Sequence, residues 1–205
     1  MYHPLLESIF NAYEDNFIDD PDYCIRFYEG NSYNFDAVDV FDGEYLYKYE
    51  MITARYITAL VQNRQYKKAV TESEKIVAII NSNATRLCIE HAMDSPYNGI
   101  IYQRAIAKYN SYVFKSALQD FEFLLRLDPE NEHLQRWRIA SKYYYYEYCF
   151  MGLAFALFAC NWFLEHHVHR FVNIGILVAG FICCGIAIRY SIITRRRLKK
   201  AEEPE

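Results

Sequence analysis

Three histidines lie close together near the C-terminal end of the chain. His166, His167 and His169 fall within the segment EHHVHR, and imidazoles at such close spacing can bind zinc or copper. A metal site needs three or four ligands that converge on the ion, and the only carboxylate nearby is Glu165. We therefore expect a polar loop without a bound metal or any other cofactor, and metal handling by this loop is the weaker alternative.

Carboxylates in the N-terminal part of the chain are the second set of residues with metal-binding chemistry. They form two groups whose spacing, without a closing glutamate, differs from that of an EF-hand calcium loop: Asp19, Asp20, Asp22, Asp36, Asp39 and Asp42. A solvated acidic face is the simpler interpretation. The sequence also has no Ser/His/Asp or Cys/His arrangement, no paired catalytic carboxylates and no glycine-rich phosphate loop, with seven glycines in all. We expect a protein that is not an enzyme.

Two apolar runs flank the histidine loop. They extend from Tyr143 to Leu164 and from Phe171 to Ile188. A helix of about 20 residues, with a rise of about 1.5 Å per residue, spans a hydrocarbon core of roughly 30 Å. The sequence therefore predicts a membrane hairpin over residues 143–193, with helices at 143–164 and 171–190. Tyrosine favours the membrane interface, so the four tyrosines at 143–146 mark the start of the first span.

Basic residues near the two runs predict the side of the membrane on which the rest of the chain lies. Five follow the predicted second helix (171–190), three precede the first run and one lies in the loop: Arg195, Arg196, Arg197, Lys199 and Lys200, then Arg136, Arg138 and Lys142, then Arg170. Lys and Arg next to membrane helices stay in the cytoplasm. We therefore expect an integral membrane protein whose N-terminal module and C-terminal tail, residues 194–205, are cytoplasmic. The membrane would be the inner or plasma membrane if the source is bacterial.

Small residues recur every four positions in both apolar runs. They are Gly152, Ala156 and Cys160 in the first run, and Gly175, Ala179, Cys183 and Ala187 in the second. Small residues along one helix face let two helices approach closely. Packing within the hairpin and homo-oligomerisation would both use such seams, and the sequence leaves the choice between them open.

The N-terminal quarter differs in charge from the rest of the chain. Residues 1–50 contain 12 acidic and two basic residues, whereas residues 51–205 contain 14 acidic and 20 basic residues. The apolar residues among the acids of the first 43 positions are too many for a disordered tail. We expect residues 1–43 to form a cap that packs on the following helices, and burial of four phenylalanines to decide its stability: Phe10, Phe27, Phe35 and Phe41.

Residues 44–142 have the apolar spacing of paired helices. The first pair covers residues 43–80, with Asp42 as its N-cap and a polar break at residues 62–65. Polar residues at 81–83 predict the end of this pair.

A second helix pair follows after a less patterned segment. It covers Tyr97–Tyr109 and Tyr112–Leu127, with a turn at residues 110–111, and Pro129 ends it because proline cannot extend a helix. A further helix begins near Asn131 and has no breaker before the first apolar run. We expect it to continue into that run as one long helix.

The second pair resembles the tetratricopeptide repeat, a helix-turn-helix unit of about 34 residues. Ala105 and Ala117 take the small positions, Phe114 and Phe121 the aromatic positions, and Pro129 the terminal proline. The first pair matches less fully, with Tyr66 and Ala69 retained but Ile57 and Ser73 at the other two positions. The resemblance covers residues 44–142 and implies an all-α fold, an α-solenoid fragment of tetratricopeptide-like hairpins followed by the membrane hairpin.

The resemblance also implies a groove for a partner. With tetratricopeptide geometry, the concave side of the first helix of the second pair would expose an aromatic and mildly basic surface, completed by an arginine of the next helix: Tyr102, Ile106, Tyr109, Asn110 and Arg136. The family's clamp for C-terminal carboxylates uses Lys and Asn, and Tyr102 and Ile106 depart from that clamp. The alternative is that these aromatic residues pack against the N-terminal cap.

These observations predict a membrane-anchored cytoplasmic scaffold that binds a protein partner, with the lipid bilayer as its second partner and no nucleic acid. One alternative is an oligomerising membrane effector or regulator whose module senses a ligand. The sequence does not identify the protein partner.

Overall fold

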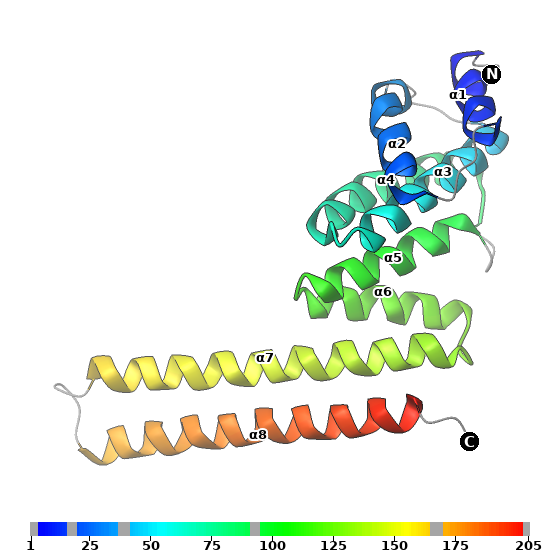
Figure 1. Ribbon diagram of the computed structural model, residues 1–205. Helices are drawn as coiled ribbons and strands as arrows, with labels where there is room; N and C mark the ends of the chain where they lie inside the picture. The colour runs from blue at the N-terminus through cyan, green and yellow to red at the C-terminus, as the bar shows by residue number, and fades with distance from the viewer. Residues whose placement is uncertain (1–3, 16–19, 37–41, 91–94, 165–169, 203–205) are drawn as a thin grey trace. The chain divides into compact units, whose positions relative to one another are not determined.

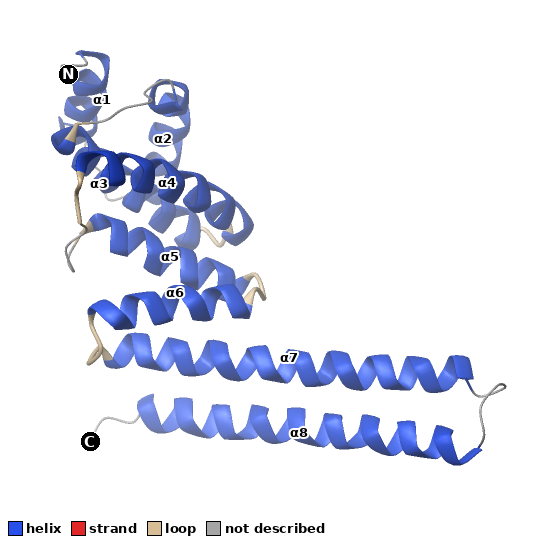
Figure 2. Ribbon diagram, turned by 180° about the vertical axis from the view of Figure 1, so that it is seen from behind, coloured by secondary structure: helices blue, strands red, loops and turns tan. Residues whose placement is uncertain are grey.

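The computed structural model describes residues 4–15, 20–36, 42–90, 95–164 and 170–202. These residues form helices and no strands, as Figures 1 and 2 show. The helices are α1 (Pro4–Asp15), α2 (Pro21–Asp36), α3 (Gly43–Gln62), α4 (Tyr66–Leu87), α5 (Pro96–Asn110), α6 (Phe114–Leu127), α7 (Glu132–Leu164) and α8 (Arg170–Glu202). The expected all-α class is confirmed.

The chain divides into two compact units. Unit 1 covers Met1–Pro129 and contains α1 to α6, and unit 2 covers Glu130–Glu205 and contains α7 and α8. The sequence suggested a boundary at residues 142 and 143, whereas α7 passes through these positions without a break. The expectation of one long helix from near Asn131 through the first apolar run is confirmed.

Helix α3 is the central element of unit 1. It packs against α1, α2, α4 and α5. Its N-terminus is capped as expected, because the Asp42 carboxylate accepts a hydrogen bond of 3.0 Å from the backbone N–H of Tyr45. Nine of its side chains are buried, which matches its contacts on several sides: Leu46, Tyr49, Glu50, Ile52, Thr53, Tyr56, Ile57, Ala59 and Leu60.

The N-terminal helices pack on α3 mainly through aromatic rings. The ring centroid of Tyr28 lies 4.1 Å from that of Tyr56 and 5.5 Å from that of Phe35, with the rings nearly parallel. Phe10 and Phe35 are buried, Phe27 is half-buried, and Phe41 lies outside the described residues. Each such aromatic pair adds about 0.5–1.5 kcal/mol beyond its buried area.

Charged contacts between α2 and the following helices lie at the surface. Lys68 Nζ is 2.7 Å from Glu29 Oε1, and both side chains are close to half exposed. Water and salt screen a pair of this kind, so it contributes about 0–1 kcal/mol. Burial of the rings therefore outweighs the opposed charges in holding α1 and α2 on α3.

The helix pairs α3–α4 and α5–α6 are joined by the same turn. Arg64 in the first turn and Tyr112 in the second both have positive φ, at 57° and 63°. Three backbone hydrogen bonds follow the same pattern in both turns: Asn63 to Ala59, Arg64 to Val61 and Gln65 to Leu60, then Ser111 to Ala107, Tyr112 to Tyr109 and Val113 to Lys108. The second turn has one more, from Ser111 to Lys108. Two segments with different sequences therefore form turns of the same backbone geometry.

Small residues let the helices of each pair approach closely. Ala105 and Ala117 are fully buried in the α5–α6 pair, beside the buried Phe114 and Phe121. Ala69 and Ser73 of α4, which correspond to Ala117 and Phe121 of α6, are also fully buried. The alanine and phenylalanine positions of the second pair, and Ile57, Ala69 and Ser73 of the first, are thus core positions, whereas Tyr66 is half-buried and Pro129 is exposed.

Helix α4 is longer than the sequence predicts. The polar residues 81–83 were expected to end it, but it continues to Leu87 and stops at Cys88, whose φ is 54°. Asn83 is buried, and its side-chain amide donates a hydrogen bond of 3.0 Å to the Ile79 carbonyl. Because this side chain is satisfied within the helix and Ala84 is buried beyond it, the additional turns form.

The small residues of α7 that pack against α8 differ from the seam predicted for the first apolar run. Ala154, Gly180 and Ala187 are buried, and a Cβ atom at Gly180 would lie 2.7 Å from a ring carbon of Phe158. Of the first predicted seam, all three members are exposed: Gly152, Ala156 and Cys160. That seam does not pack against α8 within the hairpin.

Substitution of Ala117 by leucine tests the packing of the α5–α6 pair. The larger side chain should overpack this fully buried position and lower the free energy of unfolding by about 1–3 kcal/mol. Thermal melting of the purified protein, followed by far-UV circular dichroism, should show a lower midpoint for Ala117→Leu. Ser82→Leu, at an exposed position of α4, is the matched control and should melt like the wild type. Equal midpoints for Ala117→Leu and the wild type would contradict the assigned core position.

Candidate binding sites

The predicted groove residues of α5 lie along one face of that helix. Tyr102, Ile106 and Tyr109 are half-buried, and Asn110 is exposed. The Asn110 amide donates a hydrogen bond of 2.8 Å to the Ile106 carbonyl, so it is held within the helix. Residues four and seven positions apart on a helix share a face, so α5 presents a continuous surface of this composition.

The two tyrosines of this face also contact α6. The Tyr102 ring meets the Phe121 ring edge-on at 6.4 Å, and the Tyr109 ring meets the Phe114 ring edge-on at 5.3 Å. Each tyrosine is therefore held on one side by a buried phenylalanine, and each is half-buried. Such fixed aromatic rings lose little conformational entropy on binding, which favours their use as contact residues.

The fifth predicted groove residue, Arg136, belongs to unit 2. It lies on α7, where its guanidinium is 3.4 Å from the Glu132 carboxylate one turn earlier. The α5 face therefore contains four of the five predicted groove residues, and Arg136 is not one of them.

A buried ionic cluster joins α5 to α6. Arg104 donates two hydrogen bonds to the Asp120 carboxylate, at 2.7 and 2.9 Å, and Lys108 donates a third at 2.9 Å. The Lys108 and Asp120 side chains are more than nine-tenths buried. Removing one partner from a buried pair costs about 3–5 kcal/mol, because a charge is left without compensation. We therefore interpret this cluster as structural; the sequence analysis did not identify it, since its members come from two different helices.

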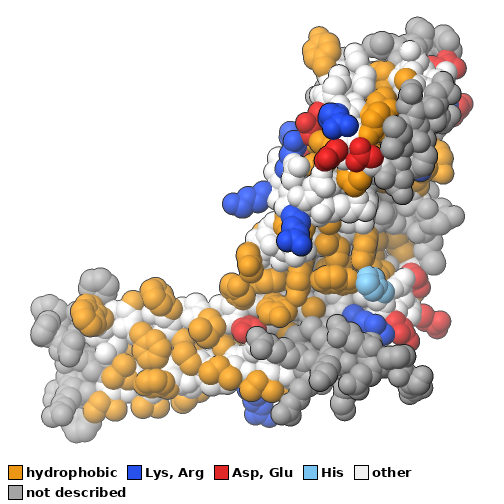
Figure 3. Space-filling model, in the orientation of Figure 1, with side chains coloured by type: hydrophobic (Ala, Val, Ile, Leu, Met, Phe, Trp, Pro, Cys, Tyr) orange, Lys and Arg blue, Asp and Glu red, His pale blue; other side chains and the backbone are white. Residues whose placement is uncertain are grey.

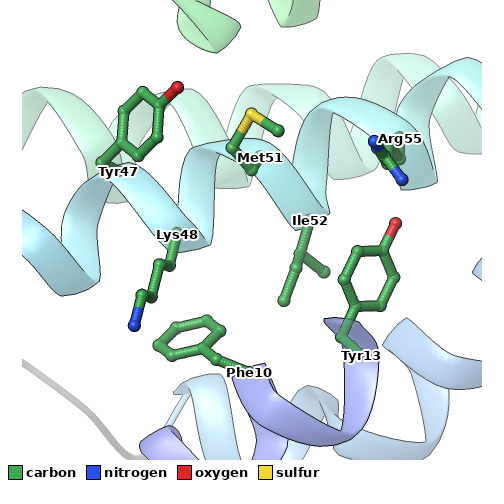
Figure 4. A pocket seen from close by; sticks show the side chains of 7 residues that line it. All are labelled: Phe10, Tyr13, Tyr47, Lys48, Met51, Ile52 and Arg55. Atoms are coloured by element: carbon green, nitrogen blue, oxygen red, sulfur yellow. The ribbon is translucent and has the colours of Figure 1, made fainter. Parts of the chain in front are cut away.

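A cavity of about 330 Å³ lies between α1 and α3. Two residues of α1 and five of α3 line it: Phe10, Tyr13, Tyr47, Lys48, Met51, Ile52 and Arg55 (Figure 4). The Lys48 ammonium is 6.0 Å from the centroid of the Phe10 ring, and the Arg55 guanidinium carbon is 5.9 Å from that of Tyr13. The lining thus combines a mainly apolar surface with two cationic side chains, and sequence reasoning had not assigned a site to these residues.

Tyr13 is the most buried polar residue of this cavity. Its hydroxyl is buried and has no hydrogen-bond partner within 3.5 Å among the described residues. Burial raises the pKa of Tyr13 to about 12, with the nearby Cys24 thiol acting in the same direction and Arg55 opposing it. The hydroxyl consequently keeps its proton at neutral pH and can donate a hydrogen bond.

Glu50 is a buried carboxyl group between α3 and the start of α5. Its Oε2 accepts a hydrogen bond of 3.0 Å from the Ser95 hydroxyl, and that hydroxyl also caps α5 by accepting from the Tyr97 N–H. Burial raises the pKa of Glu50, and the hydrogen bonds from Ser95 and the Tyr97 backbone oppose this without cancelling it. The carboxyl therefore holds its proton more tightly in the folded protein than in the unfolded chain.

No metal site is found among the described residues. Within the described ranges, no three His, Cys, Asp or Glu side chains are grouped so that they could hold an ion. The histidines of the segment EHHVHR lie outside the described residues, so the metal-handling alternative for this loop stays a prediction.

The fold and these surfaces define an all-helical chain made of helix pairs with one helical hairpin. No protein family, curated protein or solved structure that was compared with it matches.

The pKa of Glu50 predicts a pH dependence of stability. Since the folded state binds this proton more tightly, the free energy of unfolding should fall as pH rises above about 4.5, the ordinary value for a glutamate, toward the higher pKa of the folded protein. Glu50→Gln retains an acceptor for Ser95 and removes the ionisation, so its melting temperature should fall less over this pH range.

The control for this experiment is Glu122→Gln, an exposed glutamate of α6. It should keep the pH dependence of the wild type. Melting curves of Glu50→Gln that change with pH as steeply as those of the wild type would show that the Glu50 carboxyl is not the group responsible.

Proposed function

We propose that this protein is a membrane-anchored helical-repeat scaffold that binds a protein partner through the α5 face of Tyr102, Ile106, Tyr109 and Asn110. The observation that carries the proposal is the composition of that face, on which two tyrosines are fixed by α6 and still reach solvent. Tyrosine is enriched at the centres of protein interfaces because it supplies large contact area with few rotatable bonds.

The repeated turn supports a tetratricopeptide-like arrangement. Two helix pairs whose turns share three equivalent hydrogen bonds, with α3 and α4 both packed on α5, are what a helical solenoid requires. Solenoids of this type bind extended partners along the exposed helices of successive repeats. The α5 face is such a surface in this chain.

The membrane anchor is supported by the surface of α8. Among the described residues, one segment, Ile174–Ile193, is long and apolar enough to cross a bilayer, and only 11% of it is buried. Six of its large apolar side chains are exposed: Ile174, Val178, Phe181, Ile182, Ile188 and Ile192. Figure 3 shows hydrophobic side chains spread over the visible surface of the α7–α8 pair. So large an exposed apolar surface is costly in water and favourable in lipid.

Helix α7 would then cross the membrane beside α8. Its residues 148–162 carry no charged side chain, and four of its large apolar side chains are exposed: Met151, Leu153, Phe155 and Trp162. The Tyr143, Tyr146 and Phe150 rings of α7 lie within 6.1 Å of the Tyr190 ring of α8, which suits an interfacial aromatic belt. With basic residues flanking both helices, we propose a hairpin with both ends in the cytoplasm.

Cysteine labelling tests this topology. In a variant whose six native cysteines are replaced by serine, single cysteines at Tyr2 and at Glu205 should react with a membrane-impermeant reagent from the cytoplasmic side. A cysteine at His167 should react from the opposite side. Labelling of Tyr2→Cys and Glu205→Cys from opposite sides would exclude a hairpin.

Photo-crosslinking in the native cells tests partner binding. A benzoylphenylalanine residue at Tyr102 or Tyr109 should form a discrete covalent product with another protein, because these side chains lie in the proposed interface. The control position is Tyr33 of α2, which is 82% exposed and lies outside the α5 face. The absence of a product from Tyr102 and Tyr109, or the same product from Tyr33, would contradict the proposal.

A further inference from the structure

The cavity between α1 and α3 has the size and lining of a small-molecule site. Its volume of about 330 Å³ falls at the lower end of the range of about 300–1,000 Å³ for ligand pockets. Phe10, Met51 and Ile52 supply an apolar surface. Ligand sites in proteins combine such a surface with a few polar groups that fix orientation.

The polar groups of the cavity are donors and cations. Lys48 and Arg55 are two turns apart on α3, which corresponds to about 10 Å along the helix axis. None of the described lining residues is a carboxylate, but Lys48 forms an ion pair of 3.0 Å with Glu44 one turn earlier, so the positive charge of Arg55 is the one that selects a ligand. A cationic ligand would meet a like charge there, whereas an anionic ligand would meet a complementary one.

The Tyr13 hydroxyl lies beside the cationic group of the cavity. The residue is only 6% exposed, and Figure 4 shows its hydroxyl directed across the cavity toward Arg55. Arg55 and the Cys24 thiol both interact with this hydroxyl, but neither reaches the distance and angle of a full hydrogen bond. Because a guanidinium cannot accept a hydrogen bond, an acceptor bound beside Arg55 would complete the pairing of the phenol.

We propose that this cavity binds a small organic carboxylate with an apolar body. The carboxylate lies between the Tyr13 hydroxyl and the Arg55 guanidinium, and the apolar body lies along Phe10, Met51 and Ile52. A carboxylate accepts hydrogen bonds from a phenol and a guanidinium at once, and charge-assisted bonds of this kind are the stronger class. The volume suits a free small molecule better than a folded segment of a partner protein. This site is independent of the α5 face.

Binding is measured by isothermal titration calorimetry on the full-length protein in lipid nanodiscs, with empty nanodiscs subtracted. The probes are three carboxylates, naphthoate, indoleacetate and decanoate, and the matched neutral compound naphthamide. At least one carboxylate should bind, and naphthoate should bind about tenfold more tightly than naphthamide, since the amide lacks the charge. Failure of all three carboxylates to bind, or equal affinity for naphthamide and naphthoate, would overturn the proposal.

Two substitutions locate the site. Tyr13→Phe and Arg55→Gln should each weaken binding of the carboxylate about tenfold, because each removes one charge-assisted hydrogen bond. Tyr13→Phe keeps the ring that contacts Phe27 and removes a hydroxyl that makes no full hydrogen bond to the described residues, so the variant should fold like the wild type. The controls, Tyr33→Phe and Arg126→Gln, alter exposed residues of α2 and α6 and should keep wild-type affinity.

Hydrogen exchange with bound carboxylate gives the second measurement. Protection should increase in α1 and in residues 47–55 of α3, which line the cavity. Unchanged affinity in both Tyr13→Phe and Arg55→Gln, or protection confined to other helices, would show that the carboxylate binds elsewhere and would refute the assignment.

Discussion

Unit 1 depends on the burial of α3 from several sides at once. Its contacts with α1, α2, α4 and α5 require apolar side chains around most of its circumference, and its polar groups at buried positions are each satisfied. The Thr53 hydroxyl donates a hydrogen bond of 2.7 Å to the Tyr49 carbonyl, and the Glu50 carboxyl accepts one from the Ser95 hydroxyl. Helix α3 packs less extensively against α1 than against α2, α4 and α5, and the cavity lies on this side.

The two helix pairs share a backbone design and differ in how they fill it. When the two turns are aligned, Glu72 corresponds to Asp120 and Tyr56 to Arg104. In the second pair the acid is buried between two cations, whereas in the first pair Glu72 lies near the Tyr56 phenol and forms an ion pair of 2.9 Å with Lys75. One arrangement of helices therefore accommodates an internal ion cluster in one repeat and an aromatic core in the other.

Local patterns predicted the helices better than the sites. Asp42, Pro129 and the apolar spacing placed the starts and ends of most helices, because capping and periodicity act over a few residues. The end of α4 was wrong, since burial of Asn83 outweighed its polar character. The repeat pattern was enough to propose the four residues of the α5 face. The cavity could not be predicted in this way, because its lining comes from both α1 and α3. No short-range pattern predicts that Phe10 and Met51 line the same cavity, because the whole of α2 lies between them in the chain.

The unbroken course of α7 has a mechanical consequence for an anchored protein. The segment from Glu132 to Lys142 precedes the tyrosines and continues the same helix without a hinge. At about 1.5 Å per residue it forms a stiff rod that extends roughly 16 Å beyond the aromatic belt. A transmembrane helix tilts when the bilayer thins or thickens, and a rod that continues it must tilt by the same angle. If α7 crosses a bilayer as proposed, the thickness of that membrane would thus set the tilt of residues 132–142 relative to the bilayer.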